Sequence, residues 1–141
     1  MSVALTKINK FVLNLGDKVF NLGSDQLKIA LTNTIPNVST ANQYSDLTAP
    51  IASTNLSGAN PFNLTTTSYT QTSGTAKLII ADLTLTATGS VGPFQYVVIY
   101  DDAATNKELI AFYDYGSAVT LAASDTFVID LDNTNGTLQI A

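Results

Sequence analysis

Two neighbouring runs of β-branched and aromatic residues constrain the fold of this chain more than any other feature. The runs cover residues 94–101 and 108–115, and a short polar connection separates them. Residues of these types fit the pleated surface of a strand, so the two runs predict a pair of antiparallel strands. Neither run alternates cleanly between apolar and polar residues, which predicts that both faces of the pair are covered. Such a hairpin indicates a protein built to pack against others rather than an enzyme.

Further strands are predicted on both sides of this hairpin. The candidates are residues 27–32, 66–71, 76–87, 118–121, 126–131 and 137–140, of which 66–71 is the weakest. The connections contain the Gly, Pro, Asn or Asp that turns require, including Gly116–Ser117. Asn135 and Gly136 are expected to close a hairpin between residues 129–131 and 138–140. About eight short strands at this spacing predict an all-β fold, a jelly-roll-like or Greek-key β-sandwich.

The N-terminal segment fits two structures. Apolar residues at positions 8, 11, 12, 15, 19 and 22 follow helical spacing, whereas positions 11, 13 and 15 also alternate. Gly16 interrupts either pattern. We expect a short amphipathic helix or an extended arm through about Leu15, followed by a strand through Leu22.

Residues 33–75 differ in character from the rest of the chain. Three prolines are scattered among Thr, Ser, Asn and Ala, and there is little periodicity. Long stretches without regular structure are uncommon inside a compact domain. Apolar anchors at Ile51, Leu56, Phe62, Leu64 and Tyr69 favour an ordered arm, tacked onto the body or onto a neighbouring subunit, over a meandering surface loop. We expect residues 1–141 to form one β-sandwich domain that carries this arm.

Charged side chains are scarce, at 12% of residues, and the net charge is −5. All six basic residues are lysine, so we expect no direct binding to nucleic acid. The chain has no cysteine, and its stability must come from the core. The first residues lack the pattern of a signal peptide, and no apolar run has transmembrane length. We expect synthesis in the cytoplasm and no membrane partner.

The side chains of common catalytic and metal sites are missing. Without histidine or cysteine, the usual triads and the common zinc and copper sites are excluded. We therefore predict no enzymatic activity, no catalytic residue, no cofactor and no metal site. Asp101, Asp102 and Asp114 are the best carboxylate candidates, but the first two open a turn, where aspartate is expected. Residues 130–136 are a poor calcium loop, because Asn135 stands where glycine is needed.

An ordered set of segments resembles the small structural proteins of tailed bacteriophages. The segments are residues 11–12, 21–32, 81–87, 96–102, 109–117, 125–130 and 135–138. The resemblance is loosest across residues 33–75, and it is a fold signature rather than a chemical motif. It implies a capsid cement, or decoration, protein that binds the outer capsid surface and bridges neighbouring capsomers against the pressure of packaged DNA. The implied partners are the major capsid protein and further copies of the chain, as a homodimer or homotrimer. The implied location is the capsid exterior of the virion, after synthesis in the host cytoplasm.

Six residues are candidates for contacts with other subunits. They are Phe11, Val12, Leu15, Phe62, Tyr113 and Tyr115.

Two further functions fit the sequence. A carbohydrate- or receptor-binding module on a virion fibre is favoured by the six tyrosines, since aromatic faces stack on sugar rings. Against this, Tyr96, Tyr100, Tyr113 and Tyr115 lie on predicted strands and are expected to serve cross-strand packing. A head-to-tail or tail structural component is the other alternative.

Overall fold

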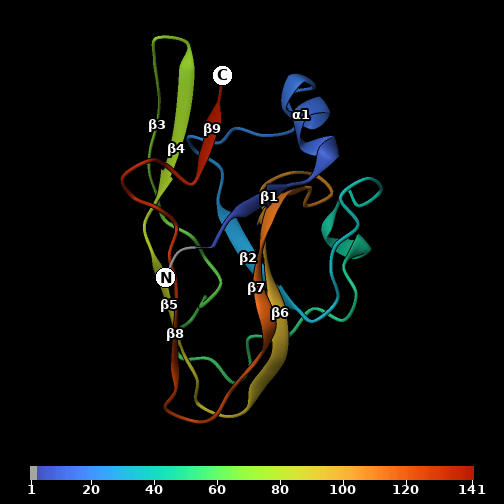
Figure 1. The fold of residues 1–141 in the computed structure, drawn as a ribbon, viewed down its shortest axis with the longest axis vertical. Helices are drawn as coiled ribbons and strands as arrows, with labels where there is room; N and C mark the ends of the chain where they lie inside the picture. Colours follow the sequence, from blue (N-terminus) through green and yellow to red (C-terminus); the bar gives the residue numbers. More distant parts are fainter. Residues whose placement is uncertain (1–2) are drawn as a thin grey trace.

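The structure is a computed structural model that describes residues 3–141, and it confirms the predicted all-β sandwich with a short helix. Its elements, labelled in Figure 1, are β1 (Leu5–Lys7), α1 (Asn9–Gly16), β2 (Leu27–Thr32), the 3₁₀ helix η1 (Tyr44–Asp46), β3 (Thr66–Thr72), β4 (Thr75–Ile80), β5 (Leu83–Thr86), β6 (Val91–Asp101), β7 (Leu109–Leu121), β8 (Thr126–Ile129) and β9 (Leu138–Ile140).

The strands form two layers. One layer is a four-stranded antiparallel sheet in the order β1-β7-β6-β2. Opposite it lie the three-stranded sheet β3-β4-β9 and the two-stranded sheet β5-β8 (Figure 1). The main core fills the space between the layers, with Ile29, Val97 and Ile99 from the large sheet and Ile80 and Ile129 from the smaller ones.

The predicted hairpin is confirmed as the β6–β7 pair at the centre of the large sheet. Val97 pairs with Tyr113, and Ile99 pairs with Ala111. Successive side chains of a strand point to opposite faces, so Val97 and Ile99 enter the main core while Val98 points the other way. Val98 is fully buried as well. The prediction that both faces of the hairpin are covered is therefore confirmed.

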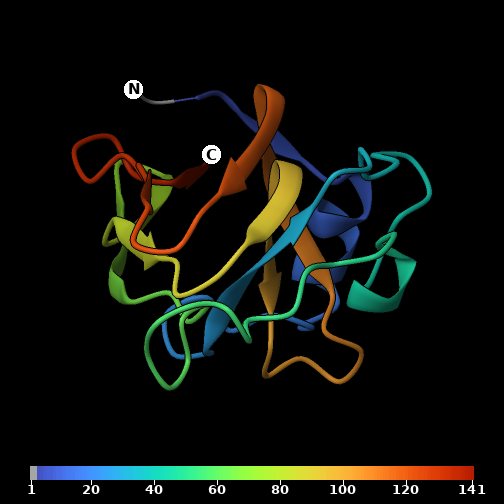
Figure 2. The same cartoon turned by 90° about the horizontal axis from the view of Figure 1, so that it is seen from below.

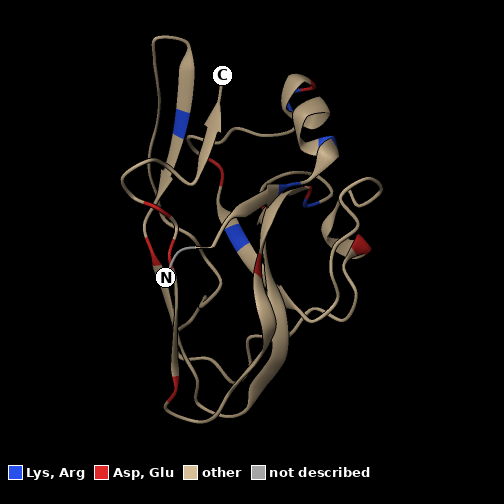
Figure 3. Ribbon diagram, viewed as in Figure 1, with Lys and Arg blue, Asp and Glu red and all other residues tan. Residues whose placement is uncertain are grey.

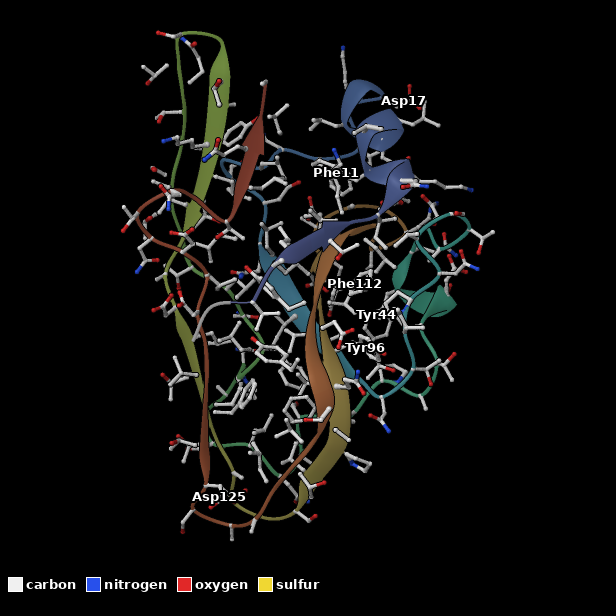
Figure 4. All side chains as sticks on the ribbon, in the orientation of Figure 1. Phe11, Asp17, Tyr44, Tyr96, Phe112 and Asp125 are labelled. Carbon is white, nitrogen blue, oxygen red and sulfur yellow. The ribbon has the colours of Figure 1, made fainter. Side chains whose placement is uncertain are left out.

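Residues 38–47 cover the back of the large sheet. Figure 2 shows this segment on the side of the sheet away from the two smaller sheets. Ala41 and Leu47 are buried there and Tyr44 is half-buried, and together they pack against a second apolar cluster that includes Tyr96, Tyr100 and Phe112. The Tyr44 ring lies 4.9 Å from the Tyr100 ring, centroid to centroid. Figure 4 shows Tyr44 next to Tyr96 and Phe112.

The remaining anchors of residues 33–75 pack onto the main core of the same chain. Leu56 and Leu64 are buried, and Ile51, Phe62 and Tyr69 are half-buried against the core. The backbone is also tied to β2, because Ile29 N–H donates to the Phe62 carbonyl at 3.0 Å. The weak strand predicted at residues 66–71 is confirmed as β3. In this structure the segment is tacked onto its own subunit.

Three local predictions are wrong. Residues 17–22 form no strand after α1, and turns hold them instead: Asn21 N–H donates to Asp25 Oδ2 at 2.8 Å. Residues 76–87 do not form one strand, because the chain breaks between β4 and β5 where Asp82 Oδ1 accepts the Leu131 N–H. Gly116 makes no turn, since β7 continues through it with the glycine at φ 82°.

The hairpin predicted around Asn135 and Gly136 is also wrong. β8 pairs with β5, and β9 pairs with β4. Thr137 directs this pairing, because its N–H donates to the Leu78 carbonyl at 2.8 Å and its hydroxyl donates to the Leu131 carbonyl at 2.6 Å. The preference of Asn135 and Gly136 for a hairpin turn was outweighed by backbone pairing between residues far apart in the sequence.

Gly92 occupies a position on β6 that only glycine fits. Its φ is +124°, and a Cβ there would lie 2.5 Å from the Val119 carbonyl oxygen. We expect Gly92→Ala to lower the free energy of unfolding by about 2 kcal/mol, measured by urea denaturation. Gly116→Ala is the matched control: it has φ +82° with no atom within 4 Å, so its cost is about 1 kcal/mol of backbone strain alone. Equal costs would show that the contact with Val119 is not what demands glycine.

Candidate interaction surface

Helix α1 is fixed to the body through its inward-facing residues. Ile8, just before the helix, is fully buried, and its N–H donates to the Ile110 carbonyl at 3.0 Å. Phe11 is 1% exposed, and its ring lies 5.3 Å from the Phe20 ring. Leu15, one turn later, packs against the same core. The spacing of these three residues is helical, so they place one face of α1 against the sandwich.

The outward face of α1 displays two large apolar side chains. Val12 is 56% exposed, and its neighbour Leu13 is 62% exposed. Both belong to a helix of only eight residues whose other face is anchored. We call this pair the α1 patch. Exposed Lys10 and Asp17 flank it along the chain, giving an apolar centre with charged neighbours.

The six predicted contact residues have very different surroundings. Val12 is exposed, whereas Leu15, Phe62 and Tyr115 are half-buried. Phe11 and Tyr113 lie in the main core with 1% and 3% exposure, so the prediction that they contact other subunits is wrong for the folded chain. Phe11 is buried because it anchors α1, and Tyr113 because its register on β7 points it between the two layers.

The tyrosines of β6 and β7 serve packing, as predicted. The rings of Tyr115 and Phe127 meet edge to face at 5.1 Å, and Tyr113 lies 6.4 Å from Tyr115. Burial, with a smaller effect of the Asp130 charge, raises the pKa of Tyr115 to about 12. Burial likewise raises the pKa of Tyr113. Rings held in this way do not form an open platform for stacking on a sugar.

The aspartates at the end of β6 act as turn residues, as predicted. Asp101 Oδ1 accepts the N–H groups of Ala103 and Ala104, at 2.9 and 3.2 Å. Asp102 Oδ1 accepts a hydrogen bond from Lys107 Nζ at 2.6 Å, and its other oxygen lies 3.5 Å from Lys28 Nζ. The Lys107 hydrogen bond is the main reason that the pKa of Asp102 is lowered.

Asp101 is fully buried, and its second oxygen, Oδ2, has no protein hydrogen-bond donor. The neighbouring acid is Asp25, brought close because Asp102 N–H donates to the Gln26 carbonyl at 3.0 Å. Burial is the main reason that the pKa of Asp101 is raised to about 7, and the neighbouring Asp25 carboxyl group raises it further. Two neighbouring carboxylates repel each other, so protonation of Asp101 at low pH removes this repulsion.

Across residues 3–141, no three His, Cys, Asp or Glu side chains are arranged to hold a metal ion. The loop at residues 130–136 uses its carboxyl groups in turns: Asp130 Oδ1 accepts the Asp132 N–H, and Asp132 Oδ1 accepts the Asn135 N–H. Of the helices in the described part of the chain, none is long and apolar enough to span a membrane.

Sequence reasoning missed Leu13, Ile35 and Val128, which are exposed apolar residues at 62%, 57% and 54%. A signal for Leu13 was present. If Ile8, Phe11 and Leu15 define the inner face of a helix, then position 13 falls on the opposite side. The competing strand pattern, in which positions 11, 13 and 15 share one face, hid this signal.

The fold and the α1 patch thus define an all-β sandwich that displays apolar side chains on a short, anchored helix. Comparison of the chain with protein-family models, with curated proteins and with solved structures gave no match.

Proposed function

We propose that this chain is a structural virion protein of a tailed bacteriophage, and specifically a capsid cement protein. The resemblance in the strand-forming segments supports this proposal, and the all-β sandwich is compatible with it. The observation that carries it is the α1 patch, where Val12 and Leu13 are exposed although the same helix is firmly anchored by Phe11. The patch is the surface that contacts the major capsid protein on the outside of the shell.

The contact is favourable because it buries apolar area while costing little conformational entropy. Full burial of a Val or Leu side chain contributes about 1.5–3 kcal/mol. Because Phe11 and Leu15 already hold α1 in place, binding does not have to order the helix. A single patch of this size is weak. A dimer or trimer that bridges capsomers adds the patches together, and many copies on one shell stabilise it against DNA pressure.

The double variant Val12→Asp/Leu13→Asp tests the patch. Two carboxylates on the exposed face cannot be buried without a large desolvation cost, while the inner face of α1 is untouched. We expect affinity for shells of the encoding phage, assembled without this protein, to fall by about tenfold or more. Co-sedimentation of the purified protein with such shells measures the loss.

Val128→Asp is the matched control, because Val128 is 54% exposed but lies on β8 rather than on α1. It should bind like the wild type. If the α1 variant also binds normally while circular dichroism shows an intact fold, α1 is not the contact. Electron cryomicroscopy of intact particles tests the broader role: density for the chain only in the tail, or its absence from virions, would refute the cement function.

A further inference from the structure

Strand β3 is an edge strand whose outer side is open. The sheet order β3-β4-β9 leaves one side of β3 without a neighbouring strand. Across residues 3–141, no segment other than β4 pairs with the backbone of residues 68–72. Figure 1 shows β3 and β4 as a hairpin whose tip forms one end of the molecule. The open side of β3 is therefore within reach of another chain.

The turn between β3 and β4 decides which backbone groups face outward. Residues 73–74 form a two-residue turn with φ of 52° and 83°, as in a type I′ hairpin. Thr72 flanks this turn, so it belongs to a hydrogen-bonded pair with β4. Because hydrogen-bonded and non-hydrogen-bonded positions alternate along an antiparallel strand, Tyr69 and Gln71 direct their N–H and C=O groups away from β4. These groups are arranged to pair with a further strand.

The other edge strands in the described part of the chain are covered or short. β2 is covered, since Ile29 N–H donates to the Phe62 carbonyl at 3.0 Å. β1 and β9 have three residues each, and β5 and β8 have four. Natural proteins usually protect a long edge by covering it or by placing charges on it. β3 has seven residues without a charge, and its bulge between Thr66 and Ser68 leaves residues 69–72 regular and open.

The lack of charge on β3 favours a second copy of the same strand as the partner. Figure 3 shows no charged residue on β3, and Lys77 is the charged residue of β4. Lys77 lies opposite Thr70. If two β3 strands pair, three strand spacings of about 14 Å in total separate the two Lys77 positions. This distance exceeds the screening length of about 8–10 Å in physiological salt, so self-pairing meets little repulsion.

We propose that β3 pairs antiparallel with β3 of a second copy of this chain. The pairing joins two three-stranded sheets into one continuous sheet across a two-fold axis. With the axis at Thr70, Tyr69 of each copy pairs with Gln71 of the other, and each pair exchanges two backbone hydrogen bonds. Thr70 then faces its own counterpart. This dimer does not rest on the virion role, because β3 and the α1 patch share no residue.

Sedimentation velocity of the purified protein, without shells, tests the dimer between about 10 µM and 1 mM. We expect a reversible monomer–dimer equilibrium with a dissociation constant of about 100 µM, because one strand edge buries less area than a standard interface. Amide hydrogen exchange, followed by NMR, locates the contact. Exchange of the Tyr69 and Gln71 amides should slow as the protein concentration rises. A wild type that stays monomeric overturns the proposal, as does a dimer in which these two amides exchange unchanged.

The variant Thr70→Glu is designed to block the dimer without disturbing the monomer. Within one copy, the new carboxylate lies opposite Lys77, which favours the hairpin. Across the two-fold axis, two carboxylates face each other, so the dissociation constant should rise by about tenfold. Thr84→Glu is the matched control, because Thr84 is an exposed strand residue on β5, and it should dimerise like the wild type. Equal dissociation constants for Thr70→Glu and wild type would overturn the proposal.

A charge-reversed partner tests whether two Thr70 positions face each other. Thr70→Lys alone should dimerise as weakly as Thr70→Glu, since like charges again meet at the axis. An equimolar mixture of the two variants should associate at least as tightly as the wild type, because opposite charges then meet. A mixture that stays monomeric would overturn the two-fold pairing.

The variant Val12→Asp/Leu13→Asp separates this dimer from the α1 patch. It is expected to lose affinity for shells and still to dimerise like the wild type, because β3 is unchanged. If this variant is monomeric while Thr70→Glu dimerises normally, the copies meet through α1 and the β3 pairing is overturned. The shell assay and the dimer assay can therefore fail independently.

Discussion

Replacing Phe94 with alanine is expected to lower the free energy of unfolding by about 3–5 kcal/mol. Phe94 is fully buried in the main core, and its ring meets the ring of Phe127 edge to face at 5.3 Å. It lies on β6 opposite Val119 of β7, so the strands on either side limit how far the core can collapse into the cavity. Urea denaturation followed by circular dichroism measures the loss.

Phe62→Ala is the comparison that isolates burial. The same ring is removed, but Phe62 is half-buried at the edge of the same core. The expected loss is about 1–2 kcal/mol. If the two variants lose equal stability, the main core is not centred between the layers where Phe94 lies.

Asp101→Asn is expected to stabilise the protein at pH 8 by about 2 kcal/mol and to leave it nearly unchanged at pH 5. The pKa of Asp101 rises from 3.8 to about 7 on folding. Its favourable contribution is therefore fully present below about pH 4 and is lost as the pH rises through about 7. Asparagine keeps an oxygen for the Ala103 and Ala104 N–H groups and places no charge beside Asp25 at any pH.

Asp114 serves as the control, because its pKa is shifted in the opposite direction to that of Asp101. Gln95 Nε2 donates to Asp114 Oδ1 at 2.9 Å and Gly116 N–H at 2.8 Å, and these bonds lower the pKa of the carboxyl group. Asp114→Asn should therefore bring no gain at pH 8. Chemical denaturation of both variants at pH 5 and pH 8 separates the cases. If wild type and Asp101→Asn show the same difference in stability between pH 5 and pH 8, Asp101 does not carry the buried proton.

The parts of the fold that were predictable are those set by local pattern. Alternation in β2 and the apolar runs of β6 and β7 identify strands because a half-buried or fully buried strand must have those sequences. The break at Asp82 was not predictable, since it depends on an N–H from Leu131, 49 residues away. The pairing of β9 with β4 depends in the same way on contacts between Thr137 and Leu78.

The interaction surface was predictable only in part, because the exposure of its residues depends on contacts with distant parts of the chain. The spacing of Phe11 and Leu15 fits a helix but left an extended arm open, and the structure shows the helix α1. Which face of that helix is covered depends on the sandwich beneath it, so Phe11 was assigned to the surface and Leu13 was missed. The burial of Tyr113 likewise follows from its strand register and from the opposing layer, neither of which a single sequence reveals.

Residues 38–47 also limit how two copies of the chain can associate. Figure 3 shows that the lower part of the β6–β7 ribbon carries little charge, so electrostatic repulsion alone would not keep the sheets of two copies apart. By lying over the back of the large sheet, Ala41 and Leu47 cover the apolar face that includes Tyr96, Tyr100 and Phe112, so this face is not free to stack on a second copy. If the proposed role on a capsid is right, association depends on small apolar patches such as Val12 and Leu13. Such weak contacts would let a wrongly placed copy leave the shell and rebind.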